Sequence, residues 1–327
     1  MDFRLDDEET TLRDTVADFC AARYPLDEIA RREAESDVSS AVWADLEDLG
    51  VFSVLVPEAA GGLGFGLRHA ALVFEQLGAA LVPGPLLWSS IVAACFPGPT
   101  PTPRVSGLAV EPAPGEPVLV EFAGDIDALI VLRPDGVVRI DGPTLPAPIA
   151  LDALDPLTPV GRYDGIPAGT LIGGPEDAAR LRAQGTVLTA SMLVGVAQAA
   201  LDVARNYSLG REQFGEPIAT FQALKHMMAD MFVRIALARS STYAAAAVVD
   251  DPEVGDPVRS ISGAKLLAGE AAIANARSAV QILGGMGFTW EMPTNHLLKR
   301  AWTLEYAFGT STDHALTMST ELAGGGR

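Results

Sequence analysis

The feature that most restricts the fold of this chain is an apolar run from Thr186 to Ala204, nearly as long as a bilayer span. A segment this apolar is buried on all sides, either in a membrane or in the centre of a large helical protein. The run contains polar side chains at Thr189, Ser191, Gln198 and Asp202, and arginines stand close to both of its ends. These features favour a central helix of a bundle, and no transmembrane segment is predicted.

Composition narrows the class of protein further. The chain has 327 residues, a net charge of −19 and 49% apolar residues. This suits one large domain or a few smaller ones of roughly 100–200 residues each, with real cores. A strongly acidic chain without a block of lysines and arginines is not expected to bind nucleic acid or an anionic membrane.

The cysteines and histidines give no sign of a metal site or a disulfide framework. The two cysteines are far apart, and the four histidines form no HxxxH or HExxH pair. His226 and His296 are therefore interpreted as hydrogen-bonding residues at a helix surface or interface, and no metal is predicted. The first residues are acidic, unlike the basic start of a signal peptide, so we expect a cytoplasmic protein.

A cluster of seven prolines between Pro97 and Pro117 divides the chain, because no helix interior accepts prolines at this density. The sequence predicts a helical N-terminal domain over residues 1–100. Short β-branched runs separated by Asp-Gly turns predict a shortened, antiparallel β-domain over residues 101–175. Residues 176–327 are predicted to form a C-terminal helical bundle, so the fold class is mainly α with a small β module.

Two local patterns support this division. Asp6 and Glu9 form an Asp-x-x-Glu cap ahead of the first helical stretch. In the C-terminal part, apolar residues at helical spacing predict a face that lies in the core, as methionine-rich stripes usually do. The residues of this face are Leu224, Met227, Met228, Met231 and Ile235.

Two C-terminal segments carry a resemblance to a known family. They are Y-S-L-G-R-E-Q-F-G-E-P-I-A-T-F-Q (Tyr207 to Gln222) and Q-I-L-G-G-M-G-F (Gln281 to Phe288). Together with W-x-x-L-x-x-L-G-V-F…V-P-E-x-x-G-G-x-G (Trp43 to Gly64) and F-E-Q-L-G-A, they resemble acyl-CoA dehydrogenases. The resemblance covers residues 1–100 and 185–320 and implies a helical N-domain, a central β-domain and a C-terminal four-helix bundle.

The resemblance also implies a cofactor site. Arg211 suits the pyrophosphate of FAD, and glycine backbone lets a cofactor approach closely. In this family such residues bind the FAD of the neighbouring subunit. Alone, a Gly-Gly pair is more often a helix end and R-x-x-F-G a turn, but their joint occurrence in this order is specific. The predicted FAD-binding residues are Arg211, Gln213, Phe214, Gln222, Gln281, Gly284 and Gly285.

The catalytic base of the family is missing from both of its usual positions. The reaction takes a proton from the acyl α-carbon and sends the β-hydrogen as hydride to the flavin, so a carboxylate must stand beside the α-carbon. Most members carry it in Tyr-Glu-Gly-Thr, where this chain has Ala-Phe-Gly-Thr with Phe308 in place of the glutamate. In a smaller branch the base precedes the first motif, and here Gly185 occupies that position. No catalytic residue is therefore predicted in this chain.

The middle of the chain departs from the family as well. Members offer a Thr-Glu-Pro…Gly-Ser-Asp stretch that contacts the flavin ring and acyl chain, whereas Ala109 to Pro117 keeps Glu-Pro-x-x-Gly and loses the hydroxyls. Thr310 and Ser311 match a turn that touches the adenine side of a chain's own FAD, here interpreted as a relic. The chain resembles the shorter, base-less subunit of actinobacterial α2β2 acyl-CoA dehydrogenases that act on steroid side-chain CoA thioesters.

Three functional hypotheses follow. The first is a non-catalytic subunit that completes the FAD site of a glutamate-bearing partner, which binds most of the acyl-CoA substrate. The second is an active homo-oligomer with a displaced base, for which Glu305 is the nearest carboxylate, although an ordinary solvated helix residue is the preferred interpretation there. The third is a flavin-free scaffold or regulator.

Overall fold

The computed structural model describes residues 4–34, 39–98, 100–113 and 115–324. The chain forms two compact units, each assembled from separate parts of the sequence. The first, called the bundle unit below, comprises Met1–Ala34, Ala71–Val82 and Thr186–Arg327. The second, called the β unit, comprises Glu35–Ala70 and Pro83–Gly185.

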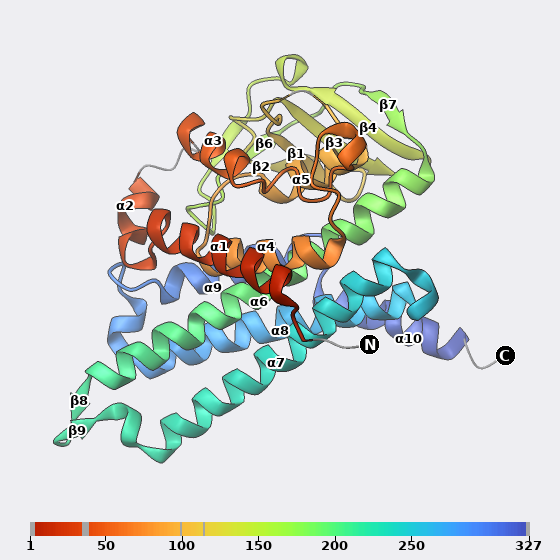
Figure 1. Cartoon of the computed structure of the whole chain (residues 1–327). Helices are drawn as coiled ribbons and strands as arrows, with labels where there is room; N and C mark the ends of the chain where they lie inside the picture. Colours follow the sequence, from red (N-terminus) through yellow and green to blue (C-terminus); the bar gives the residue numbers. More distant parts are fainter. Residues whose placement is uncertain (1–3, 35–38, 99, 114, 325–327) are drawn as a thin grey trace. The chain divides into compact units, whose positions relative to one another are not determined.

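The bundle unit is built around three long helices that run side by side (Figure 1). A central residue of α8, Asn275, donates from Nδ2 to the carbonyl of Ala197 in α6 at 3.4 Å and to that of Met231 in α7 at 3.1 Å. The helices with residues in this unit are α1 (Asp7–Arg23), α2 (Ile29–Ala34), α4 (Leu67–Ala79), α6 (Pro175–Gly210), α7 (Gln222–Asp250), α8 (Pro257–Leu283), α9 (Thr294–Tyr306) and α10 (Ser311–Gly324).

The predicted cap at the start of the chain is confirmed. The Asp6 side chain accepts from the backbone N–H of Glu9 at 2.8 Å, and the Glu9 carboxylate accepts from the backbone N–H of Asp6 at 3.0 Å. Both carboxylates also lie at the positive end of the α1 dipole. This reciprocal pair fixes where α1 begins.

The apolar run around Thr186–Ala204 lies in α6, the predicted bundle helix. Two helices of the described chain, α6 and α7, are long and apolar enough to cross a membrane, and the apolar window of α6 is 83% buried within the protein. A Cβ on Gly195 of α6 would overlap the backbone of α4, and a Cβ on Gly78 of α4 would overlap the backbone of α6. These glycines let the two helices approach backbone to backbone.

A buried ion pair joins α4, α6 and α7. Glu75 is 5% exposed and accepts from Arg239 Nε at 3.0 Å and from the Tyr243 hydroxyl at 2.8 Å. Arg239 also donates from Nη2 to Gln198 Oε1 at 3.0 Å. Burial, together with the neighbouring Glu75 carboxylate, raises the pKa of Tyr243, so its hydroxyl remains a donor.

The prediction that this apolar face of α7 lies in the core is partly wrong. Met231 and Ile235 are buried, whereas Leu224, Met227 and Met228 are half-exposed. The apolar window of α7 is 39% buried. Few side chains in the first half of α7 are therefore buried in the core of the chain, and the apolar side chains beside them stay partly exposed.

The β unit holds two sheets and the helices α3 and α5. The four-stranded sheet has the order β1-β3-β4-β7, and the three-stranded sheet has the order β2-β6-β5. The Asp-Gly turn at Asp135 and Gly136 joins β3 to β4, as predicted. The elements are α3 (Ser40–Asp48), α5 (Leu86–Cys95), β1 (Val105–Leu108), β2 (Val118–Glu121), β3 (Ala128–Arg133), β4 (Gly136–Asp141), β5 (Ile149–Leu151), β6 (Val160–Tyr163) and β7 (Thr170–Gly173).

Two expectations for this region need correction. The proline-rich segment contains strand β1, and β1 pairs with β3 in parallel, so the module is not purely antiparallel. The strand passes directly under α5, because a Cβ on Gly107 would overlap the indole of Trp88. Prolines flank this strand and do not interrupt it, which is compatible with an edge position in the sheet.

Candidate functional site

The first predicted cofactor motif forms a short hairpin between α6 and α7. Strands β8 (Glu212–Gln213) and β9 (Glu216–Pro217) pair, and the N–H of Ile218 donates to the carbonyl of Arg211 at 2.8 Å. The two turn residues, Phe214 and Gly215, have φ values of 59° and 85°, as in a type I′ turn. Figure 1 shows the hairpin projecting from the ends of the long helices.

Phe214 is strained and exposed at the same time. A bulky residue with positive φ is an outlier that costs on the order of 1 kcal/mol, and such strain concentrates at functional positions. The ring is 94% exposed, so burial within this chain does not offset the strain. Its described aromatic neighbour is Phe221, at 6.1 Å between ring centroids in an edge contact. Arg211 and Gln213 beside it are exposed as well.

The second motif lies at the end of α8. Gln281 is exposed, and Gly284 closes the helix with φ 62°, its N–H donating to the carbonyl of Gln281. A Cβ placed on Gly284 or on Gly285 would meet nothing within 4 Å. The backbone of both glycines therefore faces open space that a bound molecule can approach.

The two motifs lie at the same end of the bundle unit. Asn275 of α8 bonds to Met231 of α7, and Gly263, earlier in α8, lies 3.8 Å (from its ideal Cβ) from the hydroxyl of Ser241, later in α7. The two helices are therefore antiparallel neighbours. Gln222 at the start of α7 consequently lies at the end of the helix pair where α8 finishes.

This set of groups suits a dinucleotide pyrophosphate. One guanidinium, three side-chain amides and open glycine backbone supply donors for phosphate oxygens, and the exposed phenyl ring supplies a stacking surface. All seven predicted residues are exposed on the chain that carries them, so a molecule can reach them from solvent. FAD fits this donor set.

A substitution that relieves the backbone strain at Phe214 should change the stability of the chain and the binding of the cofactor in opposite directions. Phe214→Asn is expected to raise the free energy of unfolding by about 0.5–1 kcal/mol, because asparagine tolerates positive φ and little buried surface is lost. The same change is expected to weaken FAD retention in the assembled enzyme. Urea unfolding and flavin absorbance measure the two effects. Gly215→Ala, in the same turn, is the matched control and should destabilise; equal losses of stability in both variants would contradict this account.

Phe308 occupies a second strained corner, between α9 and α10. Its φ is 57° and it is 8% exposed. Lys265 of α8 stabilises this corner by two hydrogen bonds. Its Nζ donates to the carbonyl of Glu305 at 2.9 Å and to that of Gly309 at 2.8 Å. The side chain of Lys265 is fully buried, and burial lowers its pKa to about 8 even though Glu305 and Asp313 favour the charged form.

The interpretation of Glu305 as a solvated residue is wrong. Its side chain is 15% exposed, and Oε1 accepts from the backbone N–H of Ser311 at 2.6 Å, at the first turn of α10. Its Oε2 lies 3.8 Å from Lys265 Nζ. Glu305 is thus a capping carboxylate in an ordered cluster. Thr310 is engaged by the same helix start, since its N–H and hydroxyl both donate to Asp313 Oδ2.

Gly185 and the stretch from Ala109 to Pro117 are the other positions at which the sequence departs from the family. Gly185 is buried in α6. The stretch from Ala109 to Pro117 has no regular structure, and its Pro114 lies outside the described residues. Within it, Glu111 pairs with Arg133 at 2.9 Å.

The histidines behave differently from one another. His226 is exposed on α7, whereas His296 is fully buried, with Nε2 2.9 Å from Glu33 Oε2, so the surface interpretation is wrong for His296. Among the residues that the structure describes, no group of three or more His, Cys, Asp or Glu could hold a metal ion.

Comparison with protein families decides the identity of the fold. The acyl-CoA dehydrogenase N-terminal domain matches residues 6–97, and the acyl-CoA dehydrogenase C-terminal domain matches residues 178–322. The chain belongs to the acyl-CoA dehydrogenase family. Acyl-CoA dehydrogenase IpdE2 of Mycolicibacterium smegmatis is 34% identical over 91% of this chain and 93% of its own length. The IpdE2 of Mycobacterium tuberculosis is 32% identical over 90% and 91%.

Solved structures share the fold of this acyl-CoA dehydrogenase at low identity. The ChsE4-ChsE5 complex from Mycobacterium tuberculosis has a TM-score of 0.84 and 23% identity, covering 99% of both chains. A steroid acyl-CoA dehydrogenase, Tcur3481-Tcur3483, has a TM-score of 0.86 and 21% identity, covering 98% of both chains. The family assignment and the predicted fold class are confirmed, and the matched domains lie on either side of the atypical middle segment.

Sequence reasoning missed Lys265 and Glu75 as organising residues. Lys265 stands in the run S-G-A-K-L-L-A-G, where a lone lysine among small and apolar residues is a signal of a buried ammonium group. Glu75 stands in F-E-Q-L-G-A, again between apolar neighbours. In both cases the burial was readable from the pattern, whereas the partners, far away in sequence, were not.

Proposed function

We propose that this chain is the non-catalytic subunit of a heteromeric FAD-dependent acyl-CoA dehydrogenase that introduces an α,β double bond into an acyl-CoA. The observation that carries the proposal is the pairing of a strained, outward-facing cofactor hairpin at Phe214 with a phenyl ring at Phe308. The chain keeps the exposed hairpin residues that can contact a cofactor held by another chain. At position 308 it has a phenyl ring in place of the carboxylate that would accept a proton.

These side chains define the role that each of the two chains would have in the reaction. Bound FAD would supply the hydride acceptor, and the partner's glutamate would take the α-proton. Arg211 neutralises pyrophosphate charge, and Gln213, Gln222 and Gln281 orient it by hydrogen bonds. Phe214 covers the cofactor and excludes water. The proposed substrate, a CoA thioester of a steroid side chain, rests on resemblance and on the fold shared with a solved steroid acyl-CoA dehydrogenase.

Mass and flavin content of the assembled enzyme test the proposal. We expect co-expression with a glutamate-bearing acyl-CoA dehydrogenase of the same organism to give an α2β2 complex with one FAD for each pair of unlike chains. Two FAD per pair would show that this chain binds flavin through its own β unit. A yellow homo-oligomer with full FAD, isolated from this chain alone, would overturn the proposal.

Arg211→Ala is expected to raise the dissociation constant of FAD in the complex at least about tenfold, since a charge-assisted bond to phosphate contributes about 1.5–3 kcal/mol. Flavin retained after gel filtration and a fluorescence titration measure the change. Arg205→Ala, on α6 ahead of the hairpin, is the matched control and should retain FAD. If Arg211→Ala retained FAD as tightly as the parent, Arg211 would have no place in the cofactor site.

The two alternatives make different predictions. A displaced base at Glu305 requires a free carboxylate near the substrate, whereas one oxygen of Glu305 is engaged by Ser311 and the other lies beside Lys265. A flavin-free scaffold predicts a complex whose visible spectrum is unaffected by changes at Arg211. The spectrum of the purified complex therefore separates it from the proposed function.

A further inference from the structure

Helix α10 is held against the bundle unit by few side chains. Over residues 311–323, for which the structure gives exposures, three residues are half-buried and the rest are exposed. The three are Ser311, His314 and Met318, which lie at helical spacing on one face. Met318 lies against α8, with its Sδ 3.9 Å from an ideal Cβ placed on Gly263. Because so little apolar surface is buried, the polar contacts of this face decide whether α10 stays docked.

His314 lies in the middle of this face and joins α10 to two other segments. Its Nε2 is 3.1 Å from the carbonyl oxygen of Phe308, and its Nδ1 is 3.3 Å from Oγ of Ser262 in α8. The ring packs against Gly309, where φ is 100° and an ideal Cβ would come 3.1 Å from Nε2. Glycine at residue 309 therefore permits both the turn and the close approach of the imidazole.

These two contacts select one form of the imidazole. A carbonyl oxygen only accepts, so Nε2 carries a hydrogen and donates to Phe308. In the neutral ring, Nδ1 then accepts from the hydroxyl of Ser262. Protonation of Nδ1 would reverse this second bond, because a protonated ring nitrogen only donates. The neutral ring with its hydrogen on Nε2 is the form that fits both partners.

The surroundings of the ring oppose its protonation. Burial lowers the pKa of His314 below the ordinary value of 6.5, and the ammonium group of Lys265 on α8 lowers it further. The Phe308 carbonyl and the carboxylates of Asp313 on α10 and Glu305 on α9 act in the opposite direction, and burial outweighs them. Protonation of a docked His314 would also place a second cation beside a buried ammonium group.

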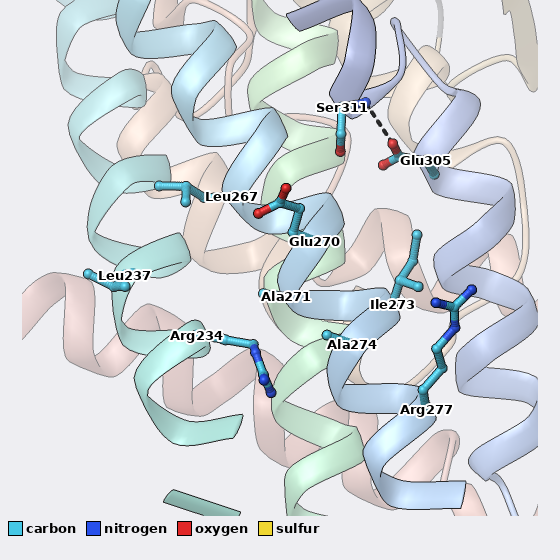
Figure 2. Close-up of a pocket in the computed structure, with 10 residues that line it drawn as sticks. All are labelled: Arg234, Leu237, Leu267, Glu270, Ala271, Ile273, Ala274, Arg277, Glu305 and Ser311. Atoms are coloured by element: carbon cyan, nitrogen blue, oxygen red, sulfur yellow. Dashed lines mark hydrogen bonds between the residues drawn. The ribbon is translucent and has the colours of Figure 1, made fainter. Parts of the chain in front are cut away.

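The two carboxylates near the ring are engaged at the start of α10. Glu305 Oε1 accepts from the backbone N–H of Ser311 at 2.6 Å, the bond drawn as a dashed line in Figure 2. Asp313 Oδ2 accepts from the N–H of Thr310 at 2.9 Å and from its hydroxyl at 2.7 Å. An imidazolium would have to compete with these bonds for its counter-charge.

We propose that His314 makes the docking of α10 sensitive to pH: the neutral imidazole holds the helix against α8, and protonation releases the helix in mildly acidic solution. The inference is independent of the proposed function, because it concerns contacts within the bundle unit alone. Below the ordinary pKa of 6.5 the released helix binds more protons than the docked one, so docking weakens as the pH falls.

Hydrogen exchange of the full-length chain, followed by mass spectrometry, tests this proposal. After correction for intrinsic exchange rates, peptides of α10 are expected to exchange at least about fivefold faster at about pH 5 than at about pH 7.5. Peptides of α6, in the centre of the bundle unit, should keep their protection. Equal protection of α10 at both pH values, or an equal loss in α6, would overturn the proposal.

Glutamine in place of His314 removes the titrating group and keeps a hydrogen-bond donor for the Phe308 carbonyl. The ratio of α10 exchange rates at the two pH values should fall close to one in His314→Gln. His226→Gln, at an exposed histidine of α7, is the matched control and should keep the acid response of the parent. An acid response that persists in His314→Gln, or disappears in His226→Gln, contradicts the assignment to His314.

The imidazole itself provides a second test in the parent chain. Its ¹⁵N resonances should show the form with the hydrogen on Nε2, and its titration midpoint should lie below pH 6.5. A midpoint at or above 6.5, or a hydrogen on Nδ1 in the neutral ring, would overturn the proposal.

Discussion

Leucine in place of Glu75 is expected to lower the free energy of unfolding by about 3 kcal/mol. The substitution leaves the Arg239 guanidinium and the Tyr243 hydroxyl without their shared acceptor in the interior of the bundle unit. Breaking a buried pair from one side costs about 3–5 kcal/mol, and the lower end applies because the Arg239 side chain is 29% exposed. Urea unfolding followed by circular dichroism measures the change.

A double variant distinguishes a lost ion pair from a packing defect. Glu75→Leu combined with Arg239→Met removes both charges and should recover most of the lost stability, because the penalty comes from the uncompensated guanidinium. Tyr243→Phe, which removes one neutral donor, should cost about 1 kcal/mol. If Glu75→Leu alone unfolded at the urea concentration of the parent, the carboxylate would have no structural part in the bundle unit.

In the proposed heteromeric complex, removal of the partner's catalytic glutamate is expected to lower turnover by several orders of magnitude, while Phe308→Glu in this chain creates no second active site. A general base contributes on the order of 10²–10⁴ to the rate. A carboxylate at residue 308 would be nearly buried at a positive-φ corner, and the flavin-contacting hydroxyls are missing from the stretch Ala109 to Pro117. Steady-state kinetics with an acyl-CoA substrate measure both variants.

Glu305→Gln is the control for that experiment. Its amide oxygen still accepts from the N–H of Ser311, so the helix start should survive and turnover should stay near that of the parent. If the variant folded, held FAD and had no activity, Glu305 would be a displaced base and this chain would be catalytic. Activity gained by Phe308→Glu would likewise show that the chain has a flavin and substrate pocket of its own.

Local chemistry made much of the fold predictable. The cap at Asp6 and Glu9, the turn at Asp135 and Gly136, and the helix around Thr186–Ala204 each follow from a pattern a few residues long. The family motifs supplied the architecture, because their residues stand in a fixed order. These features are local, so they do not depend on which distant segments meet.

Features that depend on distant contacts were not predictable. The parallel pairing of β1 with β3 and the close approach of Gly107 to Trp88 both join segments that are apart in the sequence, so no local pattern encodes them. The exposure of the first half of α7 was missed because an apolar face has the same periodicity whether its own chain or another one covers it. The seven cofactor residues remain a prediction that mutagenesis of the complex can test.

The buried ammonium of Lys265 links the folding of this chain to proton exchange with the buffer. Its pKa of about 8 lies below the ordinary value of 10.5, so the unfolded chain binds more protons than the folded one between these values, and stability rises with pH across that window. At pH 8 about half a proton is taken up at this residue on unfolding. The proton comes from the buffer, so the calorimetric heat of unfolding should increase with the ionisation enthalpy of the buffer and be larger in Tris than in phosphate at the same pH.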